Sequence, residues 1–122
     1  EKVDICLYRT KLTDQGGQAL AAGLNRPELQ DLDLRLHKTE VADETAIALG
    51  ESLSSCRKLV KLVLIVDDTK LGDPGMNCIV TVLATLPKLA TIRLDLLRTN
   101  VSRQCIDAVK LKLQRPGLSI DF

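Results

Sequence analysis

Hydrophobic residues in this chain follow two alternating spacings that recur along its length. In Leu32–Leu36 they occupy every second position, which predicts a β-strand with one apolar and one polar face. In Glu44–Leu53 they recur at intervals of three and four, which predicts an amphipathic helix. The same order of strand and helix follows Leu62 and Ile92, and an incomplete copy begins at Val3. The pattern therefore predicts repeated units of one strand and one helix.

The repeat length is close to constant. Successive units open at Leu29, Leu59, Leu89 and Leu118, which gives steps of 30, 30 and 29 residues. Helical positions keep the same step, at Leu20, Leu49, Ile79 and Val109 and again at Leu24, Leu53, Leu83 and Leu113. We therefore expect a single domain over residues 1–122, with repeats at approximately 1–28, 29–58, 59–88 and 89–117 and a terminal strand at 118–122.

A short polar segment recurs between each expected strand and its helix. It reads LYRTKLTD at 7–14, LHKTEVAD at 36–43, VDDTKLGD at 66–73 and LLRTNVSR at 96–103. Because a tight bend leaves backbone groups in need of partners, we expect its threonines to form a ladder of hydroxyls bonded to main-chain groups. These are Thr10, Thr39, Thr69 and Thr99. The carboxylates of Asp14, Asp43 and Asp73 are expected to act as N-caps of the helices they precede, with Ser102 in that role in the fourth unit.

One strand and one helix cannot bury their apolar sides alone. Stacking such units forms a parallel sheet covered by a layer of helices, with a shared core between them. Because a helix is wider than a strand, the stack bends, with strands on the concave side and helices on the convex side. The sequence therefore predicts an α/β solenoid, a horseshoe segment of about four repeats of 29–30 residues.

The repeated motif L-x-x-L-x-L-x-x-x-x-T-x-(L/V), followed by an amphipathic helix, resembles the ribonuclease-inhibitor-like class of leucine-rich repeats. The resemblance covers residues 3–122. Members of that class are mostly intracellular binding scaffolds, among them inhibitors and the sensor arms of NOD-like receptors. The resemblance implies recognition through the concave strands and carries over no catalytic residue. This chain has threonine where the class usually has asparagine or cysteine.

Composition excludes several functions. The net charge of +1 and the 2% of aromatic residues argue against nucleic acid as a partner. The apolar runs are far shorter than the roughly 20 residues of a membrane span, so we expect no membrane partner. Four cysteines without a C-x-x-C pair and a single histidine, His37, do not form a zinc motif, and we expect no cofactor. An enzyme built on Cys6 and His37 is not favoured, because no nucleophile, base and orienting group converge in one place.

The strand residues that alternate with the leucines are candidates for a protein-binding surface. We assign to it Arg35, Val63, Ile65, Asp67, Arg93, Asp95 and Leu97. Val63 and Ile65 stand where neighbouring repeats carry charge, and with Cys6 and Leu97 they could form an apolar centre with a polar rim. The alternative is that two β-branched residues only stiffen their strand. Replacing both with Asp is expected to preserve folding and to abolish binding.

The sequence therefore favours a non-catalytic scaffold that binds a protein partner through its concave face. The alternative is a ligand-sensing or autoinhibitory arm of a larger signalling or innate-immune receptor. No polar capping repeat is recognisable at either end, so we expect a fragment of a longer chain whose uncapped ends could self-associate. Cysteines interpreted as free thiols indicate a reducing compartment, the cytoplasm or alternatively the nucleus.

Overall fold

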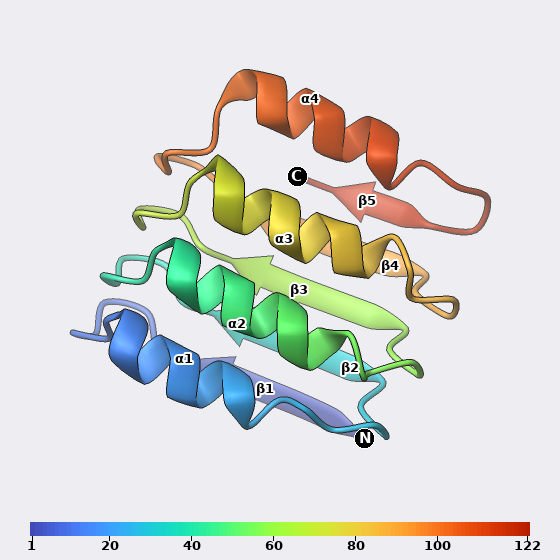
Figure 1. Cartoon of the computed structure of the whole chain (residues 1–122), viewed down its shortest axis with the longest axis horizontal. Coiled ribbons are helices and arrows are strands. Elements are labelled where there is room, and N and C mark those ends of the chain that lie inside the picture. Colours follow the sequence, from blue (N-terminus) through green and yellow to red (C-terminus); the bar gives the residue numbers. More distant parts are fainter.

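The computed structural model describes all 122 residues and contains five strands and four helices in strict alternation (Figure 1). The strands are β1 (Lys2–Cys6), β2 (Asp31–Arg35), β3 (Lys61–Ile65), β4 (Thr91–Asp95) and β5 (Ser119–Asp121). The helices are α1 (Asp14–Ala22), α2 (Asp43–Leu53), α3 (Asp73–Leu83) and α4 (Arg103–Lys112). None of them is long and apolar enough to cross a membrane.

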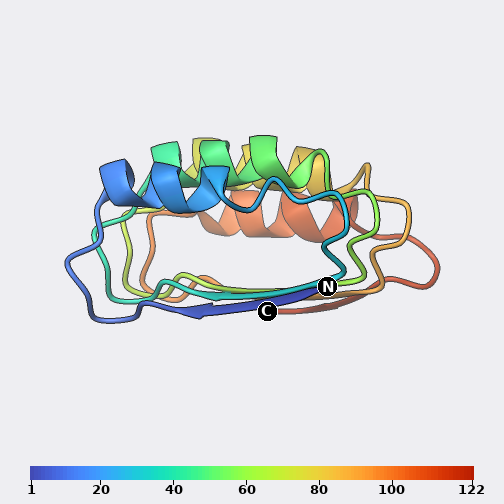
Figure 2. The ribbon, with the colours of Figure 1, turned by 90° about the horizontal axis from the view of Figure 1, so that it is seen from below.

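The strands form one parallel sheet in the order β1-β2-β3-β4-β5, so every unit lies beside its neighbours in sequence. Figure 2 shows the two layers edge-on, with all helices on one side of a slightly curved sheet. The register keeps equivalent residues opposite one another, as in Leu34, Leu64 and Leu94. This arrangement is a leucine-rich-repeat solenoid, as the repeat pattern predicts, with strands on its concave side and helices on its convex side.

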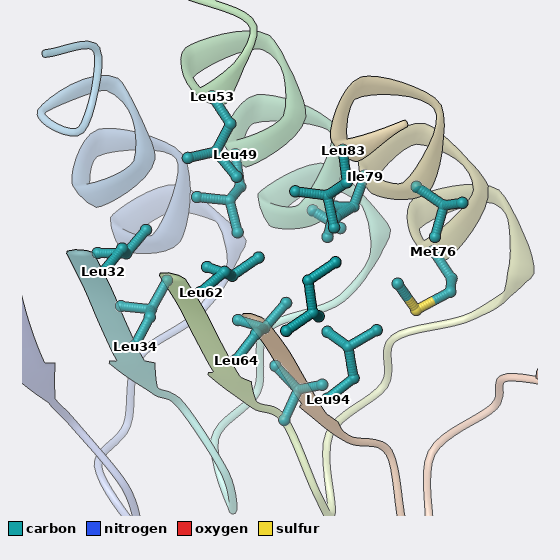
Figure 3. Close-up of a cluster of buried hydrophobic side chains, with 14 of the residues drawn as sticks. Leu32, Leu34, Leu49, Leu53, Leu62, Leu64, Met76, Ile79, Leu83 and Leu94 are labelled. Carbon is teal, nitrogen blue, oxygen red and sulfur yellow. The ribbon is translucent and has the colours of Figure 1, made fainter. Parts of the chain in front are cut away.

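The core is a continuous slab between the two layers (Figure 3). Strand residues such as Leu62 and Leu64 project toward the helices and meet Leu49, Ile79 and their equivalents, all almost fully buried. One 27-residue cluster of buried hydrophobic residues extends through the repeats without interruption. Burial of apolar surface between units is therefore the main force that holds the solenoid together.

The helix-capping prediction is wrong in one respect, because Asp14 and Asp43 cap the following helix and not their own, and Asp73 bonds to the residue that caps α4. Asp14, Asp43 and Asp73 are the first helical residues, and the residues before α1, α2 and α3 make no side-chain cap bond. Asp14 Oδ1 accepts hydrogen bonds from the N–H groups of Ala42 (2.8 Å) and Thr45 (3.1 Å). The carboxylate therefore occupies the acceptor position of an N-cap for α2 from the neighbouring repeat.

The same contact recurs along the helix layer. Asp43 Oδ1 accepts from Gly72 N–H (2.8 Å) and Gly75 N–H (3.1 Å) at the start of α3. Asp73 accepts from the N–H and the hydroxyl of Ser102, both at 2.7 Å, and these bonds lower the pKa of Asp73. Ser102 in turn accepts from Cys105 N–H and caps α4, as the sequence predicts. Three carboxylates thus link four helices in series.

Each of β1 to β4 leads into a turn that contains a non-glycine residue in the left-handed backbone region. These residues are Arg9, Lys38, Asp68 and Arg98, with φ of 60°, 58°, 56° and 57°. The threonine that follows each one donates its hydroxyl to the carbonyl three residues earlier, at 2.7–2.8 Å. The acceptors are the carbonyls of Leu7, Leu36, Val66 and Leu96. The ladder of Thr10, Thr39, Thr69 and Thr99 therefore closes each turn within its own repeat and makes no bond between repeats.

Replacing Thr69 with valine is expected to lower the free energy of unfolding by about 1–2 kcal/mol. Its hydroxyl is buried, and valine of similar shape would leave the carbonyl of Val66 without its donor. Thr10→Val is the matched control, because Thr10 makes the equivalent bond at an exposed position where water can replace it. Urea unfolding of both variants measures the difference. Equal losses would show that the hydroxyl's burial is irrelevant.

Candidate protein-binding surface

The sheet face opposite the helices carries the side chains that alternate with the core leucines. The register arranges them in four rows across β1 to β4. The fourth row lies just beyond the ends of the strands. There the backbone N–H groups of Arg9, Lys38 and Asp68 each donate to a carbonyl of the next repeat, which continues the pairing. We call these rows together the concave face. They are Lys2, Asp31, Lys61 and Thr91; Asp4, Asp33, Val63 and Arg93; Cys6, Arg35, Ile65 and Asp95; Tyr8, His37, Asp67 and Leu97.

Two ion pairs of opposite order flank the middle strand. On β2, Arg35 donates to both oxygens of Asp33, at 3.0 and 3.1 Å, and this hydrogen-bonded pairing raises the pKa of Arg35. On β4 the order is reversed, and Arg93 donates to Asp95 two residues later, at 3.1 Å in the shorter bond. All four charges are therefore neutralised within their own strands. A partner that covers them does not bury an unpaired charge.

Val63 and Ile65 lie between these pairs on β3. The register places Asp33 and Arg93 on either side of Val63. It likewise places Arg35 and Asp95 on either side of Ile65. Each apolar side chain keeps only 7% of its surface exposed, although both lie outside the core cluster. Long arginine stems cover such neighbours while their charged groups stay in water.

The expected four-residue apolar centre does not form. Arg35 separates Cys6 from Ile65 across the sheet, and Leu97 lies in the next row beyond Asp95. The expectation that Val63 and Ile65 tolerate aspartate is also inconsistent with their burial, because a carboxylate there would lose most of its hydration. Tests of this face therefore need substitutions at its exposed positions.

The fourth row supplies the exposed apolar surface. Leu97 is 61% exposed and Tyr8 is 49% exposed, at opposite ends of the row. The rings of Tyr8 and His37 stack with centroids 4.8 Å apart and an interplanar angle of 4°. Nδ1 of His37 is buried there without a hydrogen-bond partner. Asp67 accepts a bond from the backbone N–H of Leu97 at 3.1 Å, which fixes the turn that presents this leucine.

The structure does not bring Cys6 and His37 together as a reactive pair. Cys6 lies beside Arg35 in the third row, whereas His37 lies in the fourth row against Tyr8. Of the other cysteines, Cys56 and Cys105 are buried and Cys78 is half-buried, and all four are free thiols. No group of three or more His, Cys, Asp or Glu side chains is close enough to hold a metal ion.

Three contributors to this face were not among the residues assigned from sequence. Asp33 is the partner of Arg35, and Tyr8 and His37 form the stacked end of the fourth row. The alternation of apolar and polar positions already placed all three on the concave side. Their specific contacts depend on side-chain conformation and on the register of separate strands, which the spacing alone does not determine.

Comparison with known proteins supports the fold. No protein-family model matches the sequence, and no curated protein matches it. Among solved structures, this chain is similar to one described as leiomodin-1 actin-binding site 2, with a TM-score of 0.72 and 16% sequence identity. The similarity covers 99% of this chain and 70% of that chain. At this identity it shows a shared leucine-rich-repeat architecture.

Proposed function

We propose that this chain is a non-catalytic protein-binding module that recognises a protein partner through its concave face. The observation that carries the proposal is the arrangement of β2, β3 and β4, where two internally neutralised ion pairs lie on either side of Val63 and Ile65. Exposed Tyr8 and Leu97 add apolar contact area at the edge of the same face. Preorganised side chains with little uncompensated charge reduce the cost of association.

The similarity to an actin-binding site supports a protein as the partner class, because that structure has the same architecture and carries a protein-binding title. We further propose that the chain is of the ribonuclease-inhibitor-like class, which is supported by a helix after every one of β1 to β4 and a repeat of close to 30 residues. In a longer signalling protein, the same face could instead hold a neighbouring domain inactive. The four free thiols support a reducing compartment, the cytoplasm or the nucleus.

The proposal is tested by comparing substitutions on opposite faces. The double variant Tyr8→Asp/Leu97→Asp adds charge at two exposed positions of the concave face. Proteins captured from a lysate by the wild-type chain are expected to be depleted at least about tenfold in captures with this variant, because a carboxylate would replace apolar contact area. Quantitative mass spectrometry measures the depletion.

The matched control is Ile47→Asp/Leu111→Asp, which adds the same two charges at exposed apolar positions of α2 and α4. This variant is expected to retain the captured proteins. Equal depletion by both variants, or retention by the concave-face variant, would be inconsistent with recognition through the sheet. Circular dichroism of all three chains confirms that each one is folded.

A further inference from the structure

The charge pattern of the concave face is complementary to itself. Along β2 an acidic residue, Asp33, precedes a basic one, Arg35, whereas β4 has the basic Arg93 before the acidic Asp95. If a second copy of β2 or β4 lies antiparallel against the first, each acidic residue of one copy therefore faces the basic residue of the other. The middle strand presents Val63 and Ile65 to each other in the same operation.

A two-fold axis that runs across the strands, at the level of Leu34, Leu64 and Leu94, applies this operation to a whole molecule. Two copies related by it face each other through their sheets, and each strand lies antiparallel to its own counterpart. Residues of the second row then meet residues of the third row of the other copy. Asp33 faces the second copy's Arg35, and Arg93 faces the second copy's Asp95.

The outer rows match under the same axis. The first row meets the fourth, so that Lys61 faces Asp67 of the second copy and Asp31 faces its His37. On β1, Lys2 faces Tyr8 and Asp4 faces Cys6, and on β4 Thr91 faces Leu97. No position of the four rows meets a like charge. Like charges opposed in an interface oppose association, so their absence favours this arrangement.

The alternative axis, parallel to β3, gives a poorer match. It pairs Asp33 with Arg93 but places Lys61 opposite Lys61 and Asp67 opposite Asp67. It also brings Asp4 of β1 against Asp121 of β5. The charges therefore favour the axis that runs across the strands over the axis parallel to them.

We propose that the concave face binds a second copy of this chain, in a two-fold arrangement in which each strand of the sheet crosses its counterpart in the antiparallel direction. This inference rests on the proposed function, because it names a partner for the same surface. The sheet is only slightly curved (Figure 2). The side chains of Arg35 and Arg93 are 43% and 49% exposed, whereas Val63 and Ile65 are 7% exposed, so the charged side chains are the ones available for contact with the second copy. A face of four strands is small for a permanent dimer, so the association is reversible and depends on concentration.

Sedimentation velocity over about 10 μM to about 1 mM tests the proposal with three variants. Arg35→Glu/Arg93→Glu makes the two central rows acidic, and Asp33→Arg/Asp95→Arg makes them basic. Each variant alone is expected to associate at least about tenfold more weakly than the wild type, which forms a species of twice the 13.4 kDa chain mass. An equal mixture of the acidic and basic variants is expected to restore the dimer, because every central contact becomes attractive.

The third variant, Asp33→Arg/Arg35→Asp, exchanges the two charges of β2. Under the proposed axis, positions 33 and 35 of the two copies still carry opposite charges and attract each other. Under the axis parallel to β3, they would instead face like charges at positions 93 and 95. This variant is therefore expected to dimerise as the wild type does. A wild type that stays monomeric throughout, a dimer that persists in both single-sign variants, or a mixture that stays monomeric would overturn the inference.

Failure of the dimer proposal can be distinguished from failure of the proposed function. A monomeric wild type whose captured proteins are still lost with Tyr8→Asp/Leu97→Asp would leave heterologous recognition in place and would remove only self-recognition. Circular dichroism of each charge variant checks folding, and all four charges lie at least partly in solvent. The wild-type measurement requires no variant and can overturn the inference by itself.

Discussion

Replacing Leu64 with alanine is expected to lower the free energy of unfolding by about 3–4 kcal/mol. Leu64 lies at the centre of the sheet, 1% exposed, with Leu34 and Leu94 beside it in the register. Its side chain projects toward the helix layer, so its removal leaves a cavity between two layers that are held apart by other leucines (Figure 3). Such a loss is a large fraction of the 5–15 kcal/mol typical of a domain of this kind.

Two controls separate the cavity from other effects of substitution. Leu64→Met conserves most of the volume and is expected to cost less than about 1.5 kcal/mol. Leu111→Ala removes the same atoms from a position that is 73% exposed, and its expected cost is within about 0.5 kcal/mol of zero. Urea unfolding followed by circular dichroism measures all three. A loss at Leu64 no greater than that at Leu111 would be incompatible with a shared core between strands and helices.

Asp14→Ala is expected to cost about 2–3 kcal/mol, which is more than an ordinary helix cap contributes. One oxygen of this carboxylate accepts three hydrogen bonds from the next repeat, two from backbone N–H groups and one, at 2.6 Å, from the hydroxyl of Thr45. Thr45 is buried, so its hydroxyl would lose its acceptor where water has little access. Asp14→Asn keeps an acceptor oxygen and is expected to lose about half as much.

Hydrogen exchange locates this effect in the chain. The amides of Ala42 and Thr45 are expected to exchange faster in Asp14→Ala, although the substitution lies in the preceding repeat. Glu44→Ala is the matched control, because Glu44 is an acidic residue in the first turn of α2 itself but makes no cap bond. Unchanged protection of Ala42 and Thr45 in Asp14→Ala would show that the carboxylate does not cap α2.

Hydrophobic spacing was sufficient to predict the fold because each element depends on the local order of apolar residues. Leu32 and Leu34 alternate with polar residues, and Leu49 and Leu53 lie one helical turn apart. The near-constant step between Leu34, Leu64 and Leu94 then determines the sheet order, because units of equal length can stack only with their neighbours.

The details of the candidate site could not be derived in this way. An aspartate at the start of a helix has a spacing compatible with its own N–H groups and with those of the next helix, and only the offset between stacked helices decides between them. The flanking of Val63 and Ile65 by the ion pairs of β2 and β4 depends in the same way on the register between separate strands. Both features involve residues about 30 positions apart whose pairing no local pattern encodes.

The helix caps also give the solenoid a direction. In each of the three carboxylate links, from Asp14 through Asp43 to Asp73, the acceptor belongs to the earlier unit and the donor to the later one, so the two ends of the array are not equivalent. An array shortened from its amino-terminal side so that it begins at α2 or α3 loses the carboxylate that caps its first helix, whereas α4 keeps its own cap, Ser102. Shortening the array from the other side removes no acceptor from the helices that remain. Because a chain is synthesised from its amino terminus, each of these carboxylates is made before the N–H groups that donate to it.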